Sequence, residues 1–68
     1  MKISARNCLK GKIVDITPGI VTAKVRLDIG GGNEIVSVIT MDSIKELDLK
    51  VGDDAYAVIK STEVMIAI

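Results

Sequence analysis

Hydrophobic and polar residues alternate most regularly within Ile20–Ile29. From residue 21 onward the odd-numbered positions are apolar and the even-numbered positions are polar or charged, which is typical of a strand with one buried face. Gly30-Gly31-Gly32-Asn33 follows, and these residue types tolerate the positive φ angles of tight turns. A second strand is predicted from Glu34 to about Met41, so the two segments form a hairpin.

The second strand of this hairpin is apolar on both faces. Its apolar residues are Ile35, Val36, Val38, Ile39 and Met41. A strand that is buried on both sides has protein above and below it, whereas a small barrel covers only the inner side. We therefore expect the outer face to meet another subunit.

The flanking segments predict three further strands and one helical turn. Upstream, Cys8 to about Thr17 reads as a strand with a bend at Gly11, closed by a turn at Pro18-Gly19. Downstream, two short strands are predicted at about Asp54–Lys60 and Glu63–Ile68.

The helical turn is expected at Asp42–Leu47. Asp42 or Ser43 is the expected N-cap, and Glu46 stands three residues after Ser43 in the spacing of a capping box. Five strands with this helical turn between the third and fourth predict an all-β fold, a five-stranded OB-like Greek-key barrel in a single domain over residues 1–68. An SH3-like barrel is the main alternative topology.

Composition favours an oligomer. Hydrophobic residues make up 49% of the 68 residues, and a chain this short buries only about 60% of its unfolded surface. Cys8 is the only cysteine and there is no histidine, so neither a disulfide nor a zinc site is expected within the chain. Apolar surface buried between subunits is the remaining source of stability.

Charge and residue types argue against several functions. The net charge is zero and aromatic residues make up 1% of the chain, which disfavours nucleic-acid binding. No apolar run approaches the roughly 20 residues of a membrane span. Without histidine or an activated nucleophile motif, no enzymatic activity is expected. A lone cysteine and no export signal indicate the cytoplasm.

Two polar segments near the ends of the chain offer hydrogen-bond donors. Ser4-Ala5-Arg6-Asn7 supplies a hydroxyl, a guanidinium and small residues that leave backbone N–H groups accessible, and Lys60-Ser61-Thr62 supplies an ammonium and two hydroxyls. Neither segment contains a carboxylate. A site built from them suits a fully deprotonated oxyanion.

Three motifs resemble one known family, the molybdate-binding molbindins or Mop domains. They are Ser-Ala-Arg-Asn-x-Leu-x-Gly at residues 4–11, Ile-Thr-Met-Asp-Ser at 39–43 and Val-Ile-Lys-Ser-Thr-Glu-Val-Met at 58–65. The motifs occur in the family's order and spacing, and the resemblance covers essentially the whole chain.

The resemblance implies binding of molybdate, or of the similar tungstate, at interfaces within a hexamer that is a trimer of dimers, for intracellular storage or homeostasis. No organic cofactor and no cationic metal centre are implied. The implied oxyanion ligands are Ser4, Arg6, Thr40, Lys60 and Ser61, with backbone amides around Ala5, Asn7 and Thr62.

Two points stay open beside the resemblance. Cys8 stands where family members have a longer polar residue, and a free cysteine of this kind is expected to act as a small buried hydrophobe. The alternative function is that of a small OB-like module that binds RNA or a protein partner.

Overall fold

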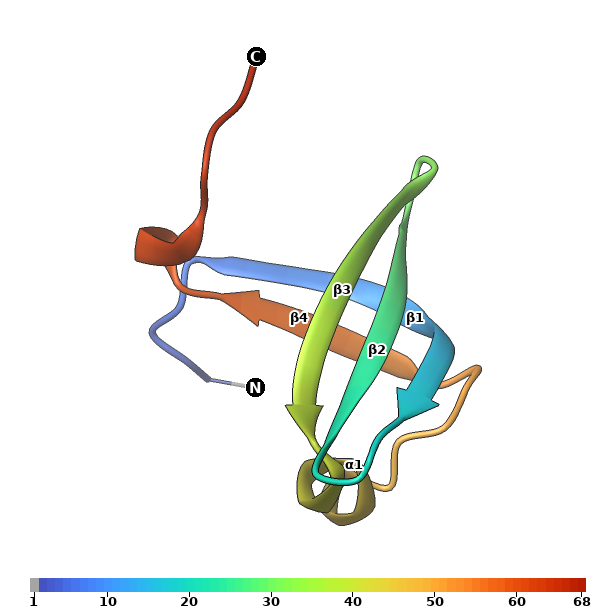
Figure 1. The fold of residues 1–68 in the computed structure, drawn as a ribbon. Helices are drawn as coiled ribbons and strands as arrows, with labels where there is room; N and C mark the ends of the chain where they lie inside the picture. The colour runs from blue at the N-terminus through green and yellow to red at the C-terminus, as the bar shows by residue number, and fades with distance from the viewer. Residues whose placement is uncertain (1) are drawn as a thin grey trace.

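The chain folds into one curled antiparallel sheet with a short helix at one end (Figure 1). The computed structural model describes residues 2–68. Its elements are β1 (Asn7–Pro18), β2 (Thr22–Gly30), β3 (Asn33–Thr40), α1 (Met41–Leu47), β4 (Asp54–Ile59) and the 3₁₀-helix η1 (Ser61–Glu63). The strand order is β3-β2-β1-β4, so β3 and β4 are the two edges of the sheet.

Strand β1 is long enough to pair with two partners in succession. Its first half, from Asn7, pairs with β4, and its second half pairs with β2, with a register shift between Ile13 and Asp15. Gly11 lies where β1 passes close to β2, because a Cβ atom there would stand 2.6 Å from the carbonyl oxygen of Asp28. The missing side chain lets one strand serve both halves of the sheet.

The hairpin of β2 and β3 matches the sequence pattern closely. Ala23, Val25 and Leu27 are buried, while the alternating polar residues of β2 face outward. Gly31 and Gly32 form the tip with φ angles of 64° and 79°, which residues other than glycine adopt at a cost. The core is small: it consists of Ile13, Val25 and Leu27, with half-buried apolar residues packed around them.

The helix begins one residue earlier than expected, and its cap is a different residue. Thr40 is the N-cap, because its Oγ1 accepts a hydrogen bond of 3.0 Å from the backbone N–H of Ser43. The backbone N–H of Met41 donates to the carbonyl of Val21 at 2.8 Å, which continues the β2–β3 register one step beyond Thr22 and Thr40 and ties the start of α1 to the sheet. The prediction of Asp42 or Ser43 as the cap, with Glu46 completing a capping box, was therefore wrong.

The structure contains four strands rather than the expected five. Residues 61–63 form η1, and residues 64–68 continue as an extended segment that pairs with no strand of the described chain. Figure 1 shows this segment running away from the sheet to the C-terminus. The all-β class and the single short helix between β3 and β4 are confirmed, but the fifth strand of the predicted barrel is not part of this chain's own sheet.

Within residues 2–68, no helix has the length and apolar character needed to cross a membrane.

Candidate functional site

The register of β1 against β4 brings the two polar end segments together. Asn7 lies opposite Ile59, the last residue of β4. Because the two strands are antiparallel, the residues before Asn7 run alongside the residues after Ile59. Arg6 and Lys60 are therefore the first residues beyond the last strand pair, and the remaining residues of the two polar segments continue from them.

These segments line a solvent-open cavity of about 480 Å³. Its walls come from the N-terminal segment, the end of β4 and η1. The lining residues are Ile3, Ser4, Ala5, Arg6, Val58, Lys60, Ser61 and Thr62. Sequence patterns predicted the six polar or small residues among them, whereas Ile3 and Val58 were not predicted because apolar side chains give no signal for an anion site.

The turn at η1 leaves backbone donors at the cavity. The N–H of Glu63 donates to the carbonyl of Lys60 at 2.9 Å, and the N–H of Val64 donates to that of Ser61 at 3.4 Å. The N–H groups of Ser61 and Thr62 come at the start of the turn, where a helix has no carbonyl of its own to offer. Within residues 2–68, neither of these two N–H groups donates a hydrogen bond to a backbone carbonyl. Two amides and two hydroxyls thus occupy one wall.

The cavity also gathers two cations. Arg6 and Lys60 both line it, and in the described chain neither forms an ion pair. The ion pairs that are present involve other cations, namely Lys12, Arg26 and Lys50. No carboxylate lines the cavity, so no side chain in its lining neutralises these two positive charges.

Two of the predicted ligands lie outside the cavity. Asn7 begins β1 and pairs with Ile59 instead of lining the wall. Thr40 caps α1, where its Oγ1 donates to Ser43 Oγ at 2.9 Å. Thr40 is therefore not among the residues that line the cavity, and Figure 1 shows α1, the helix that it caps, apart from the turn that follows β4.

Cys8 is exposed, contrary to the expectation of a buried thiol. It pairs with Val58 across the β1–β4 ladder and does not line the cavity between the two polar end segments. In the described part of the chain, no three His, Cys, Asp or Glu side chains gather in a way that could hold a metal ion.

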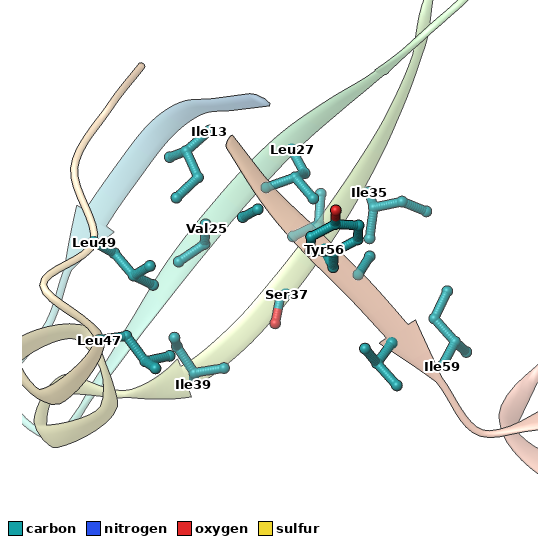
Figure 2. Close-up of a pocket in the computed structure, with 14 residues that line it drawn as sticks. Ile13, Val25, Leu27, Ile35, Ser37, Ile39, Leu47, Leu49, Tyr56 and Ile59 are labelled. Atoms are coloured by element: carbon teal, nitrogen blue, oxygen red, sulfur yellow. The ribbon is translucent and has the colours of Figure 1, made fainter. Parts of the chain in front are cut away.

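A second hollow, of about 400 Å³, has a different chemistry. It runs between β3 and β4, and its lining is almost entirely apolar (Figure 2). Ser37 and Tyr56 supply the polar side chains among its lining residues. We call it the β3–β4 groove. Without a charged side chain, this groove has nothing with which to neutralise an anion.

Comparison with known proteins identifies the family. The chain matches the TOBE domain over residues 3–66 and therefore belongs to this family. It is 58% identical over 66 residues to molybdenum-pterin-binding protein 1 of Clostridium pasteurianum, with 97% of each chain covered. The resemblance to Mop proteins that three sequence motifs indicated is thus confirmed.

Solved structures agree with this assignment. MopII from Clostridium pasteurianum superposes with a TM-score of 0.93 at 55% identity, covering 98% of this chain and 100% of the other. A molybdate-binding protein from Sporomusa ovata superposes with a TM-score of 0.92 at 43% identity, with both chains covered in full. The curled sheet with one short helix is therefore the fold of these relatives.

Proposed function

We propose that the chain binds molybdate, and the chemically similar tungstate, in the cavity between its two polar end segments. The observation that carries this proposal is the meeting of Arg6 and Lys60 in one cavity that no carboxylate lines. The relatives described as molybdenum- and molybdate-binding proteins support the identity of the anion. Their similarity extends over nearly the whole chain, so it includes both end segments.

The cavity suits a dianion with four oxygens. Arg6 and Lys60 supply charge-assisted hydrogen bonds, which are stronger than those between neutral groups. The hydroxyls of Ser4, Ser61 and Thr62 and the amides of Ser61 and Thr62 are further donors. A lining with cations but no carboxylate favours an ion without a proton of its own. Hydrogen phosphate, which keeps a proton at neutral pH, binds less well for this reason.

The site is completed by a second copy of the chain. The cavity is open to solvent and far larger than a single tetrahedral ion. Thr40, implied as a ligand by the family motif, does not line the cavity of its own chain, so in this proposal a neighbouring chain supplies it. Exposed apolar residues on the outer face of β3, Val36 at 58% and Val38 at 67%, offer surface for such a neighbour. We therefore propose a homo-oligomer, and the family resemblance implies that it is a hexamer built as a trimer of dimers.

The biological role that fits these properties is storage or homeostasis of the oxyanion in the cytoplasm, by a single Mop domain that binds rather than catalyses. The free, exposed thiol of Cys8 is in keeping with a reducing compartment. The ion is held by hydrogen bonds, without an organic cofactor. Tyr56, the sole aromatic residue, lines the β3–β4 groove and offers no stacking surface at the oxyanion cavity for a pterin ring.

Titration calorimetry combined with native mass spectrometry tests the proposal. Molybdate and tungstate are expected to bind with micromolar or tighter affinity. Sulfate is as fully deprotonated as molybdate but smaller, so selection against it depends on the size of the completed site, whereas phosphate is disfavoured by its proton. Both are expected to bind at least about 100-fold more weakly, which corresponds to about 2.7 kcal/mol. Native spectra are expected to show a hexamer that gains mass in steps of one oxyanion. Equal heats for molybdate and sulfate, or a monomer that binds no ion, would contradict the proposal.

A further inference from the structure

The hydrogen-bond donors of the oxyanion cavity do not by themselves distinguish molybdate from sulfate. Both ions are tetrahedral and carry two negative charges without a proton at neutral pH, so Arg6, Lys60 and the hydroxyls and amides beside them offer both ions the same hydrogen bonds. The attraction between opposite charges also increases as they approach, which favours the smaller ion. If the cavity binds molybdate selectively, another part of its lining must disfavour sulfate.

Three residues of the lining have no polar side-chain atom, namely Ile3, Ala5 and Val58. The side chain of Ala5 is a single methyl group. Ile3 lies in the segment before β1, outside every strand pair of the described chain, so its side chain can turn away from an ion. Val58 belongs to β4 and pairs with Cys8 of β1. Val58 is therefore the apolar lining residue whose position is fixed most closely by the sheet.

Val58 lies beside the two cations of the cavity. Lys60 has a φ of −64° and a ψ of 134°, so the extended backbone of β4 continues through this residue. Residues two positions apart in an extended chain point to the same face, and Val58 and Lys60 therefore leave β4 on one side. Arg6 is the residue next to Lys60 on the other strand's path and lines the same cavity. An anion that contacts both cations thus lies against Val58.

The side chain of Val58 presents methyl groups that cannot adjust to an ion. Valine is branched at Cβ, which restricts its χ1 angle, and Val58 is 41% exposed, so its methyl groups are accessible from the cavity. An ion oxygen that rests on a methyl group has lost water without receiving a hydrogen bond in return, and this loss is unfavourable. Contact with Val58 therefore costs every anion part of its hydration.

The loss of hydration is greater for the smaller ion. For ions of equal charge, the free energy of hydration becomes more favourable as the radius decreases, so removal of water from a small ion costs more. Sulfate is smaller than molybdate and holds its water more strongly. A methyl-lined wall beside the two cations therefore acts against sulfate more than against molybdate, which is the opposite of the preference that the cations alone would produce.

We propose that Val58 is the residue by which the oxyanion cavity distinguishes large tetrahedral dianions from small ones. Its methyl groups remove water from the ion while Arg6 and Lys60 neutralise the ion's charge, and an ion with weak hydration binds best under these conditions. This role of Val58 rests on the proposed function and names the class of ligand that the site selects. It also gives a reason for an apolar strand residue in a lining that is otherwise rich in donors.

Val58→Thr tests the proposal, because threonine has the shape of valine with one methyl group replaced by a hydroxyl and is equally suited to a strand. Calorimetry measures the binding of sulfate, selenate and molybdate, which are tetrahedral dianions of increasing size. In the original protein the affinity is expected to rise along this series. In Val58→Thr the ratio of the sulfate Kd to the molybdate Kd is expected to fall at least about 10-fold, which corresponds to about 1.4 kcal/mol, mainly through tighter binding of sulfate.

Two further variants separate the polarity of the wall from other effects. Val58→Ile enlarges the side chain but keeps it apolar and branched at Cβ, so the ratio should stay at least as high as in the original protein. Val58 also lines the β3–β4 groove, and the matched control shares this property. Val36 is an exposed valine of β3 that lines the groove but not the oxyanion cavity. Val36→Thr should leave the ratio within about 2-fold of the original value.

A ratio that falls in Val58→Thr but not in Val58→Ile or Val36→Thr supports the role of Val58. An unchanged ratio in Val58→Thr, or an equal fall in either of the other variants, overturns it. In that case the original protein still binds molybdate selectively, so the proposed function stands and the selection lies elsewhere in the cavity. Failure of the proposed function is seen before any substitution, as an original protein that binds no molybdate or binds sulfate equally well.

Discussion

Asn7 lies opposite Ile59 at the end of the β1–β4 ladder. This single pairing places Arg6 beside Lys60, although almost the whole chain separates the two residues in sequence. The two cations reach the same cavity because the ends of β1 and β4 are paired, so no additional loop is needed to bring them together. The proposed oxyanion site therefore depends as much on strand register as on the identity of its side chains.

Removing either cation is expected to weaken molybdate binding. A hydrogen bond to a charged group contributes about 1.5–3 kcal/mol, so Arg6→Ala and Lys60→Ala should each raise the molybdate Kd about 10- to 100-fold. Arg6→Lys should recover part of this loss, because it restores the charge without the planar fork. Calorimetry measures all three. Lys10→Ala removes an exposed cation of β1 that lines neither hollow and forms no ion pair within residues 2–68, and it serves as the control with an unchanged Kd.

If Arg6→Ala and Lys10→Ala bind molybdate equally well, Arg6 is not a ligand. If all variants lose affinity together, the effect comes from overall charge. Both results would contradict the site as proposed, whereas a loss confined to Arg6 and Lys60 would support it.

Thr40 has two roles that substitutions can separate. It caps α1 through its Oγ1, and the proposal adds contact with an oxyanion bound to a neighbouring chain. Asp is as good an N-cap as Thr, so Thr40→Asp should leave the thermal stability of the ion-free protein nearly unchanged. It should nevertheless weaken molybdate binding by at least 10-fold, because a carboxylate then faces the anion. Thr40→Ser keeps cap and hydroxyl and should change neither property.

Thermal melts without ligand and calorimetry with molybdate provide the two measurements for Thr40. Unchanged affinity in Thr40→Asp would leave Thr40 with a capping role alone. It would also remove the need for a second chain at the oxyanion cavity.

Much of the fold could be predicted from local patterns. The alternation within Ile20–Ile29 correctly predicted the buried face of β2, and the glycines after it correctly predicted the tip of the hairpin. The cap of α1 could not be predicted in this way, because Thr40, Asp42 and Ser43 all carry a suitable side-chain oxygen. Pairing with β2 decides between them: it keeps the backbone of Thr40 extended, opposite Thr22, and the Oγ1 of Thr40 then accepts from the N–H of Ser43.

Most of the residues that line the cavity could be predicted from the sequence, but their arrangement in space could not. Donor-rich composition and the family motifs indicated both polar end segments, yet nothing local reveals that Asn7 pairs with Ile59. The prediction of a fifth strand was wrong for a related reason. Residues 64–68 have the composition of a strand, but a strand also needs a neighbour, and this chain directs the segment away from its own sheet.

Gly11→Ala is expected to destabilise the protein. The added Cβ would stand 2.6 Å from the carbonyl oxygen of Asp28, which is backbone and cannot turn aside. Overpacking of this kind costs about 1–3 kcal/mol, and each kcal/mol lowers the Tm of so small a domain by roughly 4–8 °C. Melts at one fixed protein concentration measure the shift, with Lys10→Ala as the exposed neighbouring control. An unchanged Tm would mean that β1 and β2 can separate freely at this point.

Cys8→Ser is expected to leave molybdate affinity within about 2-fold of the original value, well below the 10-fold change that 1.4 kcal/mol produces. Cys8 is exposed on β1 opposite Val58, and its side chain lines neither the oxyanion cavity nor the β3–β4 groove. The thiol therefore has no hydrogen bond to give to the ion. Calorimetry before and after the substitution measures the affinity. A loss of 10-fold or more would show that the thiol reaches the ion in the assembled protein, and Cys8 would then join Arg6 and Lys60 as a ligand.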